Sequence, residues 1–159
     1  GRPLEDMPPV ARTARHFTPL LNNELVRDLD DMKSYVAQGS MQIVDARPKS
    51  RFEGGEPEPR PGLRAGHIPG AKNVPSSSIL NADGTLKSKD ELRAVFREAG
   101  IDPMKPVVTT CGSGVTASML SLALSVIGQT NAAVYDGSWA EWGQDSLDTS
   151  VETGPAKAG

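Results

Sequence analysis

A run of β-branched residues directly before the only cysteine of the chain constrains the fold more than any other feature. Residues 107–110 read Val-Val-Thr-Thr, which is typical of a short buried strand, and Cys111 follows directly. Residues 118–127 are mostly apolar or small and predict a buried helix that Gly128 ends. The intervening loop contains two glycines and can therefore bend tightly. The sequence predicts a strand–loop–helix unit with the cysteine at the end of its strand.

This position predicts a reactive thiol at Cys111. Backbone N–H groups and the positive end of the following helix would face the sulfur and favour the thiolate, the reactive form of cysteine. The same donors would stabilise an additional anionic sulfur or an oxyanion. Taken alone, however, a cysteine behind a buried strand is more often an unreactive core residue, so the interpretation depends on the loop sequence.

The rest of the chain alternates between strand and helix patterns. Asp28 and Gly39 delimit one helix as its caps, and a capping box formed by Ser88 and Glu91 opens another. The alternation predicts an α/β domain with a central, mostly parallel sheet, helices on both faces and a site at the carboxyl ends of the strands. Strands are expected within residues 25–26, 41–45, 66–74 and 132–135, helices over 29–37, 88–98 and 138–143, and a long charged loop over 49–64.

Length and composition favour one domain with loose ends. We expect a catalytic domain over residues 21–146, a linker or arm of the interdomain type over the proline-rich residues 1–20, and a flexible tail over residues 147–159. The net charge of −3 gives no reason to expect binding to nucleic acid or to an anionic membrane surface. No apolar run reaches the roughly 18 residues that a membrane-spanning helix needs.

The number of cysteines bears on the compartment. A single cysteine excludes an intramolecular disulfide and suits a reducing environment, which favours the cytoplasm. Because the chain begins with Gly1 and not with methionine, the presence of a preceding targeting segment stays an open question.

Four segments resemble motifs of the rhodanese superfamily. Residues 111–117, Cys-Gly-Ser-Gly-Val-Thr-Ala, resemble its active-site loop, and within the superfamily they are most similar to the loop of 3-mercaptopyruvate sulfurtransferases. Residues 45–47, 66–71 and 135–142 resemble its Asp-x-Arg, Gly-His-Ile-x-Gly-Ala and closing elements. The resemblance extends from residue 22 to residue 143 and implies a rhodanese-like fold.

The resemblance also implies a chemistry. The Cys111 thiolate would take the sulfur of 3-mercaptopyruvate, and the resulting persulfide would pass it to a thiol such as that of thioredoxin, or to cyanide. Ser113 would take part in catalysis through its hydroxyl, and Arg51 and Arg60 would bind the substrate carboxylate and keto group. No metal and no organic cofactor is implied. The persulfide would lie among the N–H groups of the loop residues Gly112, Ser113, Gly114, Val115 and Thr116.

Other functions stay open at this point. Thiosulfate sulfurtransferases of this type usually carry Cys-Arg-Lys-Gly-Val-Thr, whereas this chain has the uncharged pair Gly112-Ser113, which argues against thiosulfate as the preferred donor. A non-catalytic rhodanese-like binding module is disfavoured because Cys111 is present. Phosphatase chemistry needs an arginine six positions after the cysteine, where this chain has Ala117.

The resemblance further implies a partner and several structural roles. 3-Mercaptopyruvate sulfurtransferases usually contain two rhodanese-like domains, so a second such domain, absent from this chain, is an expected partner. Arg47 would be a structural partner inside the Asp-x-Arg element, and Asp45 would cap or brace the loop. The glycines and proline around His67 favour a structural hydrogen bond over a role as a base. The two tryptophans, Trp139 and Trp142, would pack in the core.

Overall fold

Among the residues that the structure describes, five parallel strands form the centre of the fold. The computed structural model describes residue 8, residues 16–20 and residues 22–157. The strand order is β1-β5-β4-β2-β3, and every pairing is parallel. The predicted α/β class is confirmed, and the sheet is parallel throughout. The strands are β1 Val26–Arg27, β2 Gln42–Asp45, β3 Lys72–Asn73, β4 Val107–Thr110 and β5 Ala133–Tyr135.

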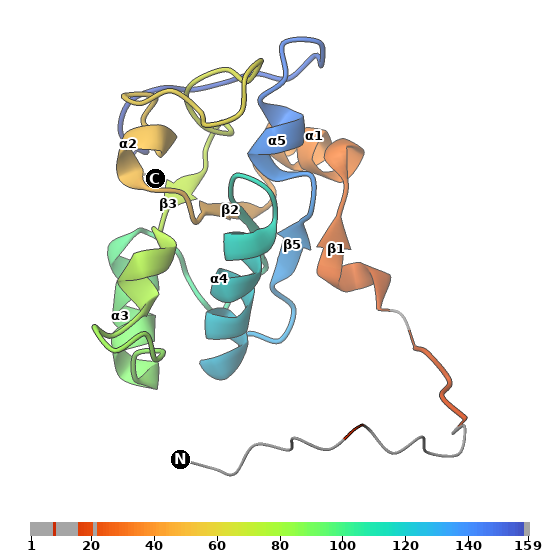
Figure 1. The fold of residues 1–159 in the computed structure, drawn as a ribbon, viewed down its shortest axis with the longest axis vertical. Coiled ribbons are helices and arrows are strands. Elements are labelled where there is room, and N and C mark those ends of the chain that lie inside the picture. The colour runs from red at the N-terminus through yellow and green to blue at the C-terminus, as the bar shows by residue number, and fades with distance from the viewer. Residues whose placement is uncertain (1–7, 9–15, 21, 158–159) are drawn as a thin grey trace.

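Helices cover both faces of this sheet, as predicted (Figure 1). The α-helices are α1 Leu29–Gln38, α2 Lys49–Phe52, α3 Lys89–Glu98, α4 Val115–Val126 and α5 Ser138–Trp142, and the 3₁₀ helices are η1 Asn23–Leu25 and η2 Ser76–Ile79. Helices α3 and α4 pack with η2 on one face. Helices α1, α2 and α5 pack on the other face. Within the described part of the chain, no helix has both the length and the apolar character needed to cross a bilayer.

The predicted caps delimit the helices. Asp28 and Asp31 form a reciprocal capping box that begins α1, and Gly39 ends the helix with a left-handed φ of 59°. Ser88 and Glu91 form the expected capping box of α3. Each cap satisfies backbone groups that a helix terminus leaves unpaired, so these boundaries follow from local sequence.

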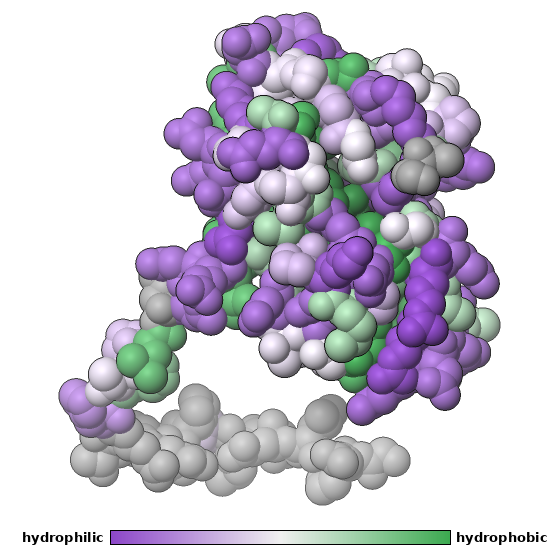
Figure 2. All heavy atoms as spheres, turned by 180° about the vertical axis from the view of Figure 1, so that it is seen from behind, coloured by the Kyte–Doolittle hydropathy of each residue, from purple (hydrophilic) through white to green (hydrophobic). Residues whose placement is uncertain are grey.

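Alternation along the strands divides the core into two clusters. Val107 of β4 and Cys111 face the cluster beneath α3 and α4, whereas Val108 faces the cluster beneath α1 and α5. The face seen in Figure 2 is mostly hydrophilic, with apolar residues between the polar ones. The described N-terminal segment, residues 16–20, is exposed and has no helix or strand. The rest of the predicted arm, apart from Pro8, lies outside the described residues.

Two predictions about loops are wrong. The segment expected as a long loop over residues 49–64 begins with the helical turn α2. The segment from residue 147, expected to be flexible, packs on the domain as far as residue 157. Its Ser150 carbonyl accepts a hydrogen bond from Trp142 Nε1 at 2.8 Å, and Glu152 bridges His67 through two backbone hydrogen bonds of 2.8 and 3.0 Å. Backbone groups make most of these contacts, so the side chains give little sign of them in the sequence.

Candidate active site

Cys111 lies at the carboxyl end of the central strand β4, where the prediction put it. The chain then turns through residues 112–114 into α4, and Gly114 is the N-cap residue with a left-handed φ of 82°. A Cβ atom at Gly114 would lie 3.0 Å from the carbonyl oxygen of Asp136. This position therefore requires glycine for its backbone conformation and for the close approach of the next loop.

Hydrogen bonds to the sulfur favour the thiolate of Cys111. Burial raises the pKa of the thiol, but the Thr116 hydroxyl and the N–H groups of Ser113, Ala117 and Thr116 donate to it and hold the pKa below its ordinary value. The Ser113 nitrogen lies 3.4 Å from Sγ. Charge-assisted hydrogen bonds of this kind stabilise the ionised form and thus the nucleophile.

The ring of N–H donors around the sulfur consists of Ser113, Thr116 and Ala117, whereas the sequence predicts residues 112–116. Gly114 directs its N–H to Ser138 Oγ at 3.0 Å and not to the sulfur, so its predicted place in the ring is wrong. Ala117, which the sequence interpretation left out, donates to the sulfur instead. An N–H in the first turn of a helix has no partner within the helix, and this is the signal that points to Ala117.

A cavity of about 430 Å³ opens beside the sulfur. Cys111 and the loop residues Gly112, Ser113, Val115 and Thr116 line one wall, which we call the sulfur wall. Residues 46–48 and 51, together with 58–60 and 63, line another part of the cavity, which we call the arginine wall. Both predicted substrate-binding arginines, Arg51 and Arg60, therefore lie at the cavity that holds Cys111.

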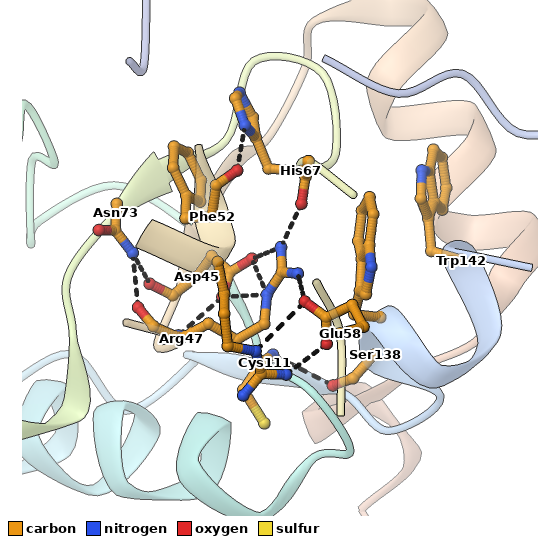
Figure 3. Close-up of polar contacts among 12 residues, drawn as sticks. Asp45, Arg47, Phe52, Glu58, His67, Asn73, Cys111, Ser138 and Trp142 are labelled. Atoms are coloured by element: carbon orange, nitrogen blue, oxygen red, sulfur yellow. Dashed lines mark hydrogen bonds and ion pairs between the residues drawn. The ribbon is translucent and has the colours of Figure 1, made fainter. Parts of the chain in front are cut away.

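Charges alternate along the arginine wall (Figure 3). The guanidinium of Arg47 contacts Asp45 at 2.7 Å, Glu58 at 2.8 Å and the carbonyl oxygen of Gly66 at 2.8 Å. It also stacks over Trp139, with 4.3 Å from Cζ to the ring centroid. Burial lowers the pKa of Arg47, but Asp45 and Glu58 outweigh it and raise the pKa above its ordinary value, so the group stays charged. Arg47 is a structural partner of Asp45, as predicted.

The two predicted substrate ligands differ in their surroundings. Arg51 pairs with the carboxylate of Glu58, and its Nη2 would lie 3.3 Å from a Cβ atom at position 112. Arg60 is exposed and makes no ion pair with any residue that the structure describes. Arg51 is thus held in place by a carboxylate, whereas Arg60 keeps its charge free for an anion.

His67 and both tryptophans have structural surroundings, as expected. His67 donates from Nδ1 to the carbonyl oxygen of Phe52 at 2.8 Å and stacks on the Phe52 ring at 3.8 Å. Burial lowers the pKa of His67 and keeps the ring neutral. Trp139 and Trp142 are buried in the core beneath α1 and α5.

Comparison with known proteins identifies the family of the chain. A model of the rhodanese-like domain family matches residues 28–145. The chain belongs to that family. The 3-mercaptopyruvate sulfurtransferase of Escherichia coli K12 is 46% identical over 127 residues, which cover 80% of this chain and 45% of that protein. Thiosulfate sulfurtransferase of Gallus gallus is 42% identical over 126 residues, which cover 79% of this chain and 43% of that protein.

A solved structure supports the fold assignment. The crystal structure of the Tum1 protein from Saccharomyces cerevisiae superposes with a TM-score of 0.74 at 33% identity, covering 82% of this chain and 47% of that one. This rhodanese-like domain therefore spans less than half the length of the relatives named here. The two curated relatives are named for different sulfur donors at similar identity, so overall similarity does not select between the donors.

Sequence reasoning missed two residues of this rhodanese-like site. The side chain of Glu58 is 2% exposed and joins Arg47 to Arg51 through ion pairs with both. Ser138 is fully buried and donates to or accepts from three backbone groups around Cys111. A carboxylate between two predicted ligands, at position 58, is a signal available in the sequence. Ser138 lies 27 residues after Cys111, and no local pattern joins the two.

Proposed function

We propose that this domain is a sulfurtransferase that takes sulfur from 3-mercaptopyruvate. The observation that carries the proposal is one cavity with two kinds of wall. Hydrogen-bond donors favour a thiolate at Cys111 on one wall, and Arg51 and Arg60 lie on the other. A planar guanidinium suits the carboxylate and keto oxygens of an α-keto acid.

The first half-reaction moves sulfur onto the enzyme. The Cys111 thiolate attacks the thiol sulfur of the donor, so an S–S bond forms while the C–S bond of the donor breaks. The electron pair of that bond stays on carbon, and pyruvate leaves as its enolate, which takes a proton from solvent. Arg51 and Arg60 stabilise the enolate charge. The N–H groups of Ser113, Thr116 and Ala117 face the persulfide that remains.

The second half-reaction returns the enzyme to its starting state. An acceptor thiolate attacks the outer sulfur, the S–S bond breaks, and its electron pair restores the Cys111 thiolate. We propose a thiol such as that of thioredoxin as acceptor, and the cytoplasm, a reducing compartment, as the place of action. Cyanide serves as a laboratory acceptor and yields thiocyanate.

Ser113 has a separate part in this proposal. It is exposed at the cavity and its nitrogen already donates to the sulfur. Its hydroxyl would polarise the donor or relay a proton to the leaving group. A second rhodanese-like domain would complete the cavity around it, because the relatives named above are more than twice as long as the matched region.

Intact-protein mass spectrometry tests the proposal. The protein is exposed briefly to 3-mercaptopyruvate or, separately, to thiosulfate, with Cys111→Ser as the matched control. A gain of one sulfur with mercaptopyruvate, little with thiosulfate and none in the variant supports the proposal. The reverse preference makes thiosulfate the donor. A protein that gains sulfur from neither donor is either a binding module or dependent on the second domain.

A further inference from the structure

Ser138 has a backbone conformation that serine rarely adopts. Its φ is 50°, and no other non-glycine residue among the described residues has a positive φ. Ser138 is the first residue of α5 and is fully buried. Strain of this kind persists only where surrounding interactions hold it, and it often marks a functional position.

The hydroxyl of Ser138 uses its full hydrogen-bonding capacity on the site. Its Oγ accepts from the N–H group of Cys111 at 3.2 Å (Figure 3). It also accepts from the N–H group of Gly114 at 3.0 Å and donates to the carbonyl oxygen of Tyr135 at 2.8 Å. A serine hydroxyl has one proton and two lone pairs, and all three are engaged.

The next two residues of α5 hold the same loop from its carbonyl side. The N–H of Trp139 donates to the carbonyl oxygen of Cys111 at 2.9 Å, and the N–H of Ala140 donates to that of Gly112 at 3.0 Å. Residues 138–140 therefore make four hydrogen bonds to residues 111–114. Both N–H and carbonyl groups of the turn are therefore held by α5. This fixes the direction of the N–H groups of Ser113, Thr116 and Ala117, which do not contact α5.

We propose that Ser138 is a positioning residue that orients the Cys111 loop so that the N–H groups of Ser113, Thr116 and Ala117 face the sulfur. The functional meaning of this role rests on the sulfurtransferase proposed above. Ser138 itself does not touch the sulfur. It draws the N–H groups of Cys111 and Gly114 away from the cavity, and in doing so it sets the turn.

A neutral substitution at position 138 leaves the number of charged side chains near Cys111 unchanged. Arg47, Arg51, Glu58 and Arg60 line the same cavity as Cys111, and Asp136 lies against Gly114. Helix α4 carries no charged side chain. A neutral replacement of Ser138 alters none of these charges, so any change in thiol ionisation reports the geometry of the hydrogen-bond donors.

The test compares Ser138→Ala and Ser138→Gly. Both variants lack the hydroxyl, but glycine accepts the left-handed φ and alanine does not. The rate of Cys111 alkylation by iodoacetamide is measured against pH. We expect both variants to raise the midpoint of the pH profile by about one unit, because the donors no longer converge on the sulfur. The matched control is Ser121→Ala on α4, whose hydroxyl donates to the Ala132 carbonyl oxygen away from the loop.

Each outcome decides the proposal. Raised midpoints in both Ser138 variants with an unchanged midpoint in the control support it. A folded Ser138→Gly protein with the wild-type midpoint overturns it. Should the variants not fold, hydrogen exchange in the wild-type protein decides: slow exchange at the amides of Cys111 and Gly114 supports the role, and exchange as fast as in an open loop overturns it. Alkylation needs no sulfur donor, so failure of the proposed sulfur transfer is seen separately.

Discussion

The two walls of the cavity are held in place by different kinds of interaction. The sulfur wall, with Cys111 and the loop up to Thr116, is held by neutral hydrogen bonds from the start of α5. The arginine wall is held by buried charges that alternate through Asp45, Arg47, Glu58 and Arg51. The first wall tunes one ionisation, while the second presents cations to an anion.

The difference teaches how one small site separates reactivity from recognition. Peptide dipoles stabilise a thiolate without adding a counter-ion that would compete with the substrate. Buried ion pairs fix side chains in place at a desolvation cost, and removing one partner leaves the other charge unpaired. Perturbing one wall should therefore leave the other nearly unchanged, and the following experiments test that independence.

The largest expected effect is on stability and concerns the segment that supports the arginine wall. Gly66, whose carbonyl oxygen accepts from Arg47, packs against Glu152 so closely that a Cβ atom would lie 2.3 Å from the Glu152 carbonyl oxygen. Ending the chain at Ser146 removes this support and the hydrogen bond that Trp142 Nε1 donates to the Ser150 carbonyl oxygen. We expect the free energy of unfolding to fall by about 3–5 kcal/mol in urea denaturation, because several buried groups lose partners.

A chain that ends at Gly154 is the control for this truncation. It keeps the bridge between Glu152 and His67 and the hydrogen bond from Gly154 to the Glu53 carbonyl oxygen at 2.8 Å. Its stability should remain within about 1 kcal/mol of the full chain. Equal stability of both truncated chains would mean that the tail does not support the arginine wall.

The next effect is on substrate binding. Arg51→Gln removes a cation from the arginine wall and should raise the KM for 3-mercaptopyruvate by about 10–100-fold, since a charged hydrogen bond is lost. Alkylation of Cys111 by the neutral reagent iodoacetamide should change by less than about twofold. Steady-state kinetics and alkylation rates provide the two measurements.

Arg93 offers a matched control for that substitution. It lies on α3, is partly exposed and pairs with Asp90 at 2.9 Å, away from the cavity. Arg93→Gln should leave KM at the wild-type value. An Arg51→Gln protein whose alkylation rate falls as much as its substrate binding would show that the walls are coupled, against the comparison drawn here.

A smaller effect is expected on donor choice. Replacing Gly112-Ser113 by Arg-Lys brings two cations to the sulfur wall, beside Arg51, and should raise kcat/KM for the thiosulfate dianion about tenfold. The same change should lower kcat/KM for 3-mercaptopyruvate, because an arginine at position 112 crowds the space near Arg51 Nη2. Ser125→Lys adds a charge near the far end of α4 and serves as the control. If kcat/KM for thiosulfate does not rise in the Arg-Lys variant, the charge of the loop does not determine which donor is used.

Features of the site and the fold differ in how far the sequence predicts them. The position of Cys111 follows from neighbouring residues, because a strand, two glycines and a helix lie within a short stretch. The caps of α1 and α3 are local in the same sense. The contacts of Ser138 join residues 24 and 27 positions apart, and the tail reaches back 85 positions to His67, mainly through backbone groups. Such pairings have no period and no motif, so only the folded chain reveals them.

The smallest effect is a pH dependence of stability at His67, which follows Gly66 in the segment that supports the arginine wall. Burial lowers the pKa of His67 in the folded protein, so the unfolded chain binds the proton more readily. The stabilising contribution of the neutral ring is complete above the ordinary histidine pKa of about 6.5 and is lost as pH falls below it. His67→Asn keeps a donor for the Phe52 carbonyl oxygen but does not titrate, so it should reduce the loss of stability between pH 6.5 and 5.

Urea denaturation at several pH values measures this slope, and His16→Asn, at an exposed position, is the control. Glu152 also faces His67, and its pKa is lowered chiefly by a hydrogen bond from Lys157, so acid destabilises the fold through it in both proteins. The difference between wild type and His67→Asn therefore reports His67 together with its charge interaction with Glu152. Identical slopes in the wild type and in His67→Asn would show that the pKa of His67 does not differ between the folded and unfolded protein. With the expected slopes, falling pH lowers the stability of the fold through His67. Rising pH, by contrast, increases the fraction of Cys111 that is the reactive thiolate. Stability and thiol reactivity would then depend on pH through different residues.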